Sequence, residues 1–340
     1  MKQPSADEAN SGYNISMASI TVSARGEAHP NLRPLNVLRD LSAVADLIEI
    51  CFSSTMDNDG RQYLQDMRKA GKDNSFTRWA NRAIETTSLP LSGYIWEENG
   101  RIVGNASLIP FKHKKKRVYL IANVAVHPDY RRRGIALALM ERSMKHVREK
   151  RVGEAWLHVR DDNPGAIDLY RKLGFVERAR RTSWQTRTDP HIPTPPPEIS
   201  ITGRRPADWQ TQLDWLSRSY PEFLAWHRDW SFTSLRPGFW NWLHLFLMDI
   251  NVRQWAAFEK GKMEAALAWI PYGRGESLFA AAGEGSDPNA LTALLFQARR
   301  ELNHSYSSIA LEFPAGKLDD AIRAAEFKPM RTLIWMQATL

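Results

Sequence analysis

Three consecutive arginines and a glycine stand at a turn that could hold an anion. The apolar run 122–126 is typical of a buried strand, and Pro128 cannot extend that strand, so the chain must turn there. Apolar residues then recur with the period of a helix, at Leu137, Met140, Met144 and Val147. A helix start has free backbone N–H groups and a partial positive charge, and Gly134 lets a ligand approach the backbone closely. The pattern predicts a phosphate-binding turn surrounded by guanidinium groups.

Two motifs make this prediction more specific. Residues 131–136 follow the pattern Arg-x-x-Gly-x-Ala, after a strand that ends Val-Ala-Val-x-Pro. Residues 157–175 read as a strand followed by Asn-x-x-Ala-Ile-x-Leu-Tyr-x-Lys-x-Gly-Phe. In this order and at this distance, the two motifs resemble the signatures of GNAT-family N-acetyltransferases. The resemblance covers roughly residues 32–188. It implies acetyl-CoA as co-substrate and a primary amine as acceptor, either a protein N-terminus or a small-molecule amine.

The resemblance also implies which residues hold acetyl-CoA. Backbone N–H groups of about residues 132–136 would bind its pyrophosphate. The backbone of 124–126 would pair with the pantetheine arm and aid the oxyanion, and Asn163 would contact that arm. The expected cofactor-binding residues are Val124, Ala125, Val126, Arg131, Arg132, Arg133, Gly134, Ile135, Ala136, Asn163 and Tyr170.

For catalysis, the resemblance implies Tyr170 as the proton donor to the leaving thiolate. Many family members carry a Glu base where this chain has Leu120, which cannot accept a proton. Tyr119 and His158 are the remaining candidates, and such a pair resembles one branch of protein N-terminal acetyltransferases, in which it activates the amine through water. A His with a pKa of about 6.5 suits an α-amino group near 8 better than a Lys near 10.4. The base therefore stays open between His158, Tyr119 and water.

Composition places the chain among globular proteins. Of its 340 residues, 43% are hydrophobic and 25% charged, and the length favours two domains. No apolar run reaches the length of a membrane span, and a single cysteine, Cys51, fits a reducing cytoplasm. Asp-Asn-Asp-Gly at 57–60 lacks the spacing and final Glu of a calcium loop, so we expect no metal site. The net charge of +8 is partly explained by an anionic co-substrate.

A basic run at 112–117 separates two strand patterns. Because it contains no aromatic residue on which a base could stack, we interpret it as a solvated hairpin tip rather than a nucleic-acid contact.

The chain is predicted to hold two related domains. Residues 1–31 read as a disordered leader, 32–188 as the catalytic domain, and the proline-rich stretch 189–198 as a linker. Residues 199–340 repeat the order of strands and helices and end in a similar Arg-x-x-x-Phe segment. Each domain is expected to be α/β (α+β), with a mixed, mostly antiparallel sheet flanked by helices. In the second domain the phosphate turn is replaced by the acidic stretch 283–287, and Ile322 replaces the tyrosine, so we expect a degenerate site there.

Local patterns predict several elements in detail. Residues 93–97 and 101–109 should form a hairpin with Asn-Gly in its turn. A helix at 288–302 should be capped by Ser286 or Asp287. Residues 35–39 read as a short strand, followed by a helix capped by Asp40.

Two other functions remain open from the sequence. The chain could be a non-catalytic acyl-CoA-binding module that contacts RNA or the ribosome through 112–117, or it could transfer a different acyl group. The presence of Tyr170 and Asn163 argues against the first alternative. Because a tandem pair can build the acceptor cleft from its inactive half, we expect a monomer or a loose dimer.

Overall fold

The computed structural model describes residues 29–53, 56, 58–70, 92–114, 116–189, 191, 198–228, 231–248, 250–270, 278–303 and 308–340. The chain divides into Met1–Pro30 and a compact unit, Asn31–Leu340, whose fold is described below. The leader and the linker fall largely outside the described residues, so both stay predictions. No helix in the described ranges is long and apolar enough to cross a bilayer.

The N-terminal half contains six strands and four helices within the described ranges. They are β1 (Leu32–Pro34), α1 (Val37–Phe52), α2 (Asn58–Ala70), β2 (Ser92–Glu98), β3 (Arg101–His113), β4 (Lys116–Val126), α4 (Ile135–Glu149), β5 (Glu154–Arg160), α5 (Pro164–Lys172) and β6 (Val176–Arg187). The predicted β2–β3 hairpin is confirmed, with Asn99 and Gly100 in the left-handed conformation that its turn requires.

The C-terminal half repeats this order of strands and α-helices from its first strand to its last. Its elements are β7 (Ser200–Thr202), α6 (Trp209–Ser219), the 3-10 helix η4 (Glu222–His227), α7 (Phe239–Leu247), β8 (Arg253–Glu259), β9 (Lys262–Trp269), β10 (Leu278–Ala282), α8 (Pro288–Glu301), β11 (Ser308–Pro314), α9 (Asp319–Ala324) and β12 (Lys328–Thr339). Of the two predicted caps of α8, Asp287 is the one used, because its side chain accepts from the Asn289 N–H at 2.9 Å.

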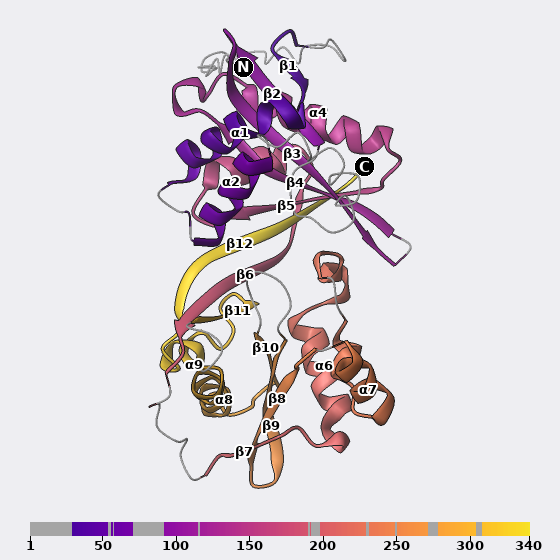
Figure 1. The fold of residues 1–340 in the computed structure, drawn as a ribbon, viewed down its shortest axis with the longest axis vertical. Coiled ribbons are helices and arrows are strands. Elements are labelled where there is room, and N and C mark those ends of the chain that lie inside the picture. The colour runs from indigo at the N-terminus through magenta and orange to yellow at the C-terminus, as the bar shows by residue number, and fades with distance from the viewer. Residues whose placement is uncertain are drawn as a thin grey trace, which may run out of the picture. The chain divides into compact units, whose positions relative to one another are not determined.

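The described strands join into one sheet of twelve strands in which the last strand of each half has changed places. The order is β1-β2-β3-β4-β5-β12-β6-β11-β10-β9-β8-β7. β12 therefore pairs with β5, and β6 pairs with β11, while the two exchanged strands pair with each other (Figure 1). The predicted mixed, mostly antiparallel sheet flanked by helices is confirmed, and the domain boundaries stay a prediction.

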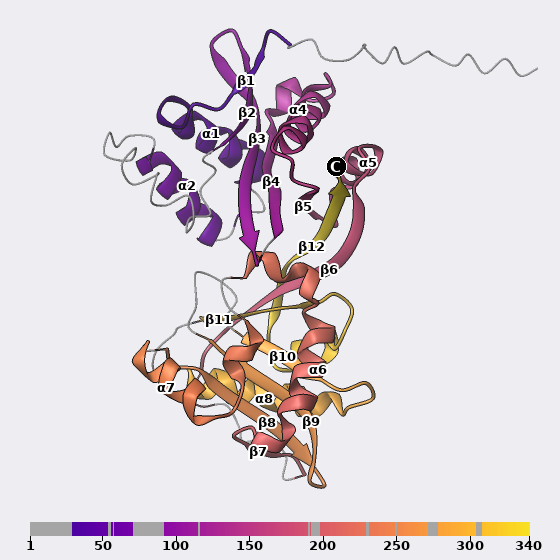
Figure 2. The ribbon, with the colours of Figure 1, turned by 90° about the vertical axis from the view of Figure 1, so that its right-hand side faces the viewer.

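Helices cover both faces of the N-terminal part of the sheet. Figure 2 shows α1 and α2 on one side of β3 and β4, with α4 on the other. Buried residues of α4, among them Leu139, Met140, Met144 and Val147, pack with β3 and β5. Leu137, predicted to belong to this stripe, is instead 41% exposed, because it lies about half a turn of helix away from Leu139.

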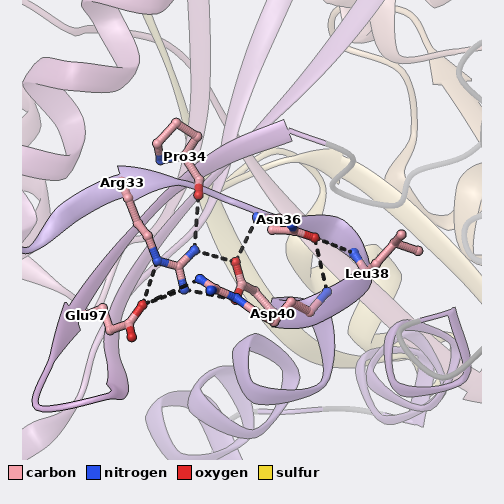
Figure 3. A network of polar contacts seen from close by, with 7 residues as sticks. Arg33, Pro34, Asn36, Leu38, Asp40 and Glu97 are labelled. Carbon is pink, nitrogen blue, oxygen red and sulfur yellow. Dashed lines mark hydrogen bonds and ion pairs between the residues drawn. The ribbon is translucent and has the colours of Figure 1, made fainter.

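The prediction at the start of α1 was wrong. The helix begins at Val37, and its cap is Asn36, whose side-chain oxygen accepts from the N–H groups of Leu38 and Arg39. Asp40 is instead buried at 2% exposure and binds Arg33, the Asn36 N–H and Arg39 (Figure 3). Burial opposes its ionisation, yet these hydrogen bonds hold the pKa of Asp40 below its usual value. The network therefore ties β1, α1 and the Glu97 carboxylate of β2 together.

Candidate functional site

The parallel strands β4 and β5 separate along their length. They pair only at Tyr119↔Ala155 and Leu120↔Trp156. From Ile121 onward no described strand pairs with β4 on its β5 side. A bulge in β4 at Asn123, whose φ is 51°, bends the strand at this point, and the Asn123 side chain binds the Tyr63 hydroxyl at 2.9 Å. The backbone of 124 and 125 therefore has no described strand partner on the β5 side, while the Val126 carbonyl accepts from Arg131 and Cys51.

The turn after β4 presents free backbone N–H groups. Gly134 precedes α4 in the left-handed conformation, with no side-chain cap, and the first hydrogen bond is from the Ala138 N–H to the Gly134 carbonyl oxygen. The N–H groups of the first helical turn, 135–137, therefore lack helical partners. Arg132 is also left-handed, with a φ of 64°, a backbone conformation that can direct neighbouring N–H groups to one side of a turn. A Cβ atom on Gly134 would meet nothing within 4 Å, so the space in front of it is open.

The three arginines at the turn are exposed, and two are held by backbone carbonyls. Arg131 donates to the Val126 carbonyl at 3.2 Å, and Arg133 donates to that of Asp129 at 3.1 Å. Arg133 also lies over the Tyr130 ring, 4.8 Å from its centroid. None of these contacts occupies the N–H groups of α4, so the positive charge stands beside a free helix start.

Asn163 and Tyr170 lie on α5, beyond the end of β5. Asn163 is exposed and caps the helix by accepting from the Ala166 N–H at 3.2 Å. Tyr170 is 6% exposed in the core beneath α4 and α5, and burial raises the pKa of its phenol to about 12. Its ring meets Phe175 edge to face. The phenol is therefore protonated at neutral pH.

The two candidate bases do not form a pair. Tyr119 lies on the α4 face of the sheet, where its ring is 5.9 Å from that of His146, and burial raises its pKa. His158 points to the opposite face, beside Trp335 and Trp226 at ring-centroid distances of 3.8 and 6.2 Å. The structure therefore does not bring Tyr119 and His158 together, contrary to the expected pairing of the two. Side chains alternate along each strand, and the register places them on different faces.

An aromatic cluster surrounds His158, and most of it comes from the C-terminal half. We call it the β5–η4 cluster; its members are Trp156, His158, Trp226, His227 and Trp335. Burial first, and the neighbouring His227 second, lower the pKa of His158 to about 3. The indole N–H groups of Trp156, Trp226 and Trp335 are buried without a hydrogen-bond partner in the described part of the chain. Sequence reasoning did not find this cluster as a unit, since alternation along β5 groups only Trp156 with His158.

The basic run 112–117 contacts the same region. Lys114 and His113, at the β3–β4 turn, both meet the Glu222 carboxylate of η4, and Lys116 lies 3.5 Å from Glu154. At least three members of the run therefore have partners within the protein, and two of them attach η4 to the N-terminal half.

In the C-terminal half, the equivalent places are filled by the chain itself. β10 and β11 pair at one position, Leu278↔Leu311, but the Ala280 N–H donates to the Tyr220 hydroxyl at 3.2 Å. At the turn before α8, a Cβ on Gly283 would lie 2.9 Å from the Trp215 ring. Bonds from Lys262, from the Ser286 hydroxyl and from the Asp287 N–H hold the pKa of Glu264 below its usual value.

Comparisons with known proteins point to one family. Residues 55–175 match the sequence model of the acetyltransferase (GNAT) family. The chain is 42% identical over 67 residues to the ribosomal protein bS18-alanine N-acetyltransferase of Escherichia coli (strain K12), covering 20% of this chain and 45% of that protein. It is 38% identical over 96 residues to an N-alpha-acetyltransferase of Sulfurisphaera tokodaii, covering 25% of this chain and 56% of that protein. The chain thus spans about half the length of these relatives.

A solved structure resembles nearly the whole chain. The GCN5-related N-acetyltransferase from Sphaerobacter thermophilus aligns with a TM-score of 0.54 at 13% identity, over 92% of this chain and 97% of that one. At this identity the likeness shows a common fold.

Proposed function

We propose that this chain, whose residues 55–175 carry the GNAT acetyltransferase signature, transfers acetyl from acetyl-CoA to a primary amine in a ternary complex. One observation carries the proposal. β4 and β5 pair at only two positions, and β4 is followed by an uncapped helix start where a Cβ on Gly134 would meet nothing within 4 Å. A long ligand with an amide-containing arm and a pyrophosphate suits both parts, because β4 offers backbone groups without a strand partner and the turn offers N–H groups.

The residues of β4 and of the turn after it would hold the co-substrate as follows. Backbone groups of 124–126 bind the arm as an added strand would, and the first turn of α4 binds the pyrophosphate with help from Arg131, Arg132 and Arg133. Bound acetyl-CoA would supply an activated acetyl thioester. Fixing it beside the acceptor replaces a collision between two molecules by reaction within one complex.

Tyr170 is the proposed donor of the proton that the leaving thiolate takes up. The amine nitrogen forms a bond to the acetyl carbon as the carbon–sulfur bond breaks, and the thiolate takes the phenol proton. With its pKa raised to about 12, Tyr170 keeps that proton throughout the neutral range. A phenolate formed in a buried site is a strong base, so the proton lost by the amine restores the phenol through water.

The amine must arrive largely as free base. His158, with a pKa near 3, is too weak a base at neutral pH, and Tyr119 lies on the other face as a protonated phenol. Solvent is then the base. An α-amino group with a pKa near 8 is far more often neutral than a Lys side chain near 10.4. We therefore propose a protein or peptide N-terminus as acceptor, in line with the activities named for the two relatives.

The C-terminal half is proposed to be catalytically silent. Tyr220 occupies the gap between β10 and β11, and Glu264 already accepts from the turn before α8. The Glu264 carboxylate at this turn would repel a pyrophosphate. This half also contributes Trp226 of η4 and Trp335 of β12, which pack beside His158.

The test is calorimetric titration of acetyl-CoA into the wild type, Gly134→Glu and Gly285→Glu. Both glycines are left-handed, at φ +78° and +73°, with nothing within 4 Å of an added Cβ, so both substitutions carry the same strain. We expect one site per chain, roughly 100-fold weaker binding in Gly134→Glu because of charge repulsion at the turn, and unchanged binding in Gly285→Glu.

The reaction itself is tested with Tyr170→Phe. We expect kcat to fall by roughly 100-fold or more with the affinity for acetyl-CoA unchanged, measured on peptides that present either an N-terminal amine or only a Lys side chain. Two acetyl-CoA sites per chain would contradict the silent half, and no binding would reject the function.

A further inference from the structure

Helix α7 exposes apolar side chains along its whole length. Six of them, counting the residue after the helix, have exposed fractions between 59% and 79%. We call them the α7 patch; they are Phe239, Trp240, Trp242, Phe246, Leu247 and Met248. The helix contains no Lys, Arg, Asp or Glu, and none of its residues is buried. A helix that is apolar on all sides is normally covered by other protein or by lipid.

The rings of the α7 patch form a continuous surface. Trp242 and Phe246 stack with their planes 14° apart and their centroids 5.6 Å apart, and Phe239 lies 5.9 Å from Trp242. Single exposed apolar residues are common, but a contiguous group of this size marks a place where something binds.

A hollow lies next to the patch. Its volume is about 520 Å³, and it is lined by Trp242, Leu245, Phe246, Ile250, Asn251 and Val252. Trp240, at 79% exposure, projects from the same helix and is not part of this lining. One surface therefore carries both a projecting indole and a hollow large enough to receive an indole.

We propose that the α7 patch joins two copies of this chain in a symmetric dimer, in which Trp240 of each copy enters the hollow of the other. A two-fold axis brings a patch against itself, which requires the knob and the hollow to lie on the same surface. An uncharged helix can meet its own copy without like-charge contacts, although the chain as a whole carries a net charge of +8.

The area is that of a stable interface. At their exposed fractions, the six side chains offer on the order of 700–900 Å² per copy, taking about 150–250 Å² for each aromatic side chain. Each partner in a standard protein interface contributes about 800 Å².

A lipid surface fits less well. Helices that lie on membranes combine an apolar face with a charged face rich in Lys and Arg, and α7 carries neither residue. The patch has the composition of an interface core, where Trp and Phe are enriched and charges are depleted.

Sedimentation equilibrium of the full chain tests the proposal. The wild type should give twice the 38.9 kDa chain mass in the micromolar range. Trp240→Asp should dissociate at least about 30-fold more readily, the effect of losing a central aromatic residue. Ile50→Asp, at an apolar residue of α1 that is 48% exposed, is the matched control and should remain dimeric. A monomeric wild type overturns the proposal.

A second measurement locates the contact. In a Cys51→Ser background, a mixture of Trp240→Cys and Val252→Cys chains should form a disulfide-linked heterodimer under mild oxidation. If Trp240→Asp stays dimeric and the mixture does not cross-link, the dimer uses another surface and the proposal fails. If the wild type is monomeric and sediments with phosphatidylglycerol vesicles while Trp240→Asp does not, the patch binds lipid, which also overturns it.

Discussion

The imidazole of His158 lies against the ring of Trp335 and near that of Trp226, with its Nε2 atom buried. Burial lowers its pKa to about 3, against about 6.5 in an unfolded chain. Between these two values the unfolded chain binds a proton that the folded chain does not. Stability is therefore complete above the unfolded pKa and is lost as the pH falls towards the folded one.

His158→Phe tests this coupling. The wild type should lose free energy of unfolding as the pH falls from about 6.5 towards 4, by up to about 1.4 kcal/mol per pH unit for this one group. The variant should lose less over the same range, because its ring cannot be protonated. Urea unfolding at several pH values measures the difference, and His191→Phe, at an exposed histidine, is the control that should behave as the wild type. Parallel pH profiles for the wild type and His158→Phe would contradict the burial argument.

Local motifs predicted the strand, the turn and the helix start around Gly134, but not the surroundings of the two candidate bases. Gly134 lies in the short segment between β4 and α4, so its conformation depends on residues close to it in the sequence. The relation of Tyr119 to His158 depends on the register between two strands, and the surroundings of His158 depend on Trp226 and Trp335, which are distant in the sequence. No local pattern contains that information. The roles of Tyr170 and Asn163 stay predictions.

At the scale of elements, the same strand–helix–strand unit is used twice with different contents. Beyond Leu120, no described strand pairs with β4 on its β5 side, while between β10 and β11 the Tyr220 hydroxyl accepts from the Ala280 N–H and donates to the Glu312 carbonyl at 3.1 Å. Tyr220 therefore satisfies two backbone groups that a ligand would otherwise meet. Because Tyr220 and Ala280 are both buried, the Tyr220 hydroxyl is part of the core of this half.

Tyr220→Phe should destabilise the protein without creating a second cofactor site. The buried Ala280 N–H loses its partner, while the Glu312 carbonyl keeps Arg181 as a donor, so we expect a loss of about 1–3 kcal/mol in the free energy of unfolding, measured in urea. Tyr94→Phe, which removes a hydroxyl bonded to the partly buried side chain of His146, should cost less. Titration should still give one acetyl-CoA per chain. An unchanged stability, or a second site, would show that Tyr220 does not have this role.

Elements with strong local signals were predicted within a few residues. The Asn-Gly turn specified the β2–β3 hairpin, and Asp287 followed by Pro288 specified the start of α8. The start of α1 was misassigned because Asn36 and Asp40 are both good caps, and only the position of Arg33 on β1 draws Asp40 into the ion network instead.

At the scale of the whole molecule, the exchange of β6 and β12 is the feature that the sequence did not predict. Both strands have the same place at the end of their halves, and either could close either part of the sheet by its pattern alone. The choice is made by contacts between halves, such as the pairing of Trp335 with His158 and the ion pair of Arg181 with Glu312. Arg181 is buried at 3% exposure, so leaving it without this partner would be costly.

Cutting the chain between Asp189 and Glu198 tests the exchange. Because β12 lies between β5 and β6, the two co-expressed fragments should purify together through a tag on one of them and unfold in a single transition. Deleting β12 from the uncut chain should expose an edge on both β5 and β6 and lead to aggregation. Fragments that separate on gel filtration and unfold independently would mean that each half closes its own sheet.

The exchanged strands also constrain how such a chain can change over generations. Each half carries the closing strand of the other, so neither can be deleted, replaced or moved to a new gene without opening its neighbour's sheet. A half that has lost its own chemistry is then still selected for its shape. Substitutions in β12, at the far end of the chain, bear on the surroundings of His158 as directly as substitutions in β5 itself.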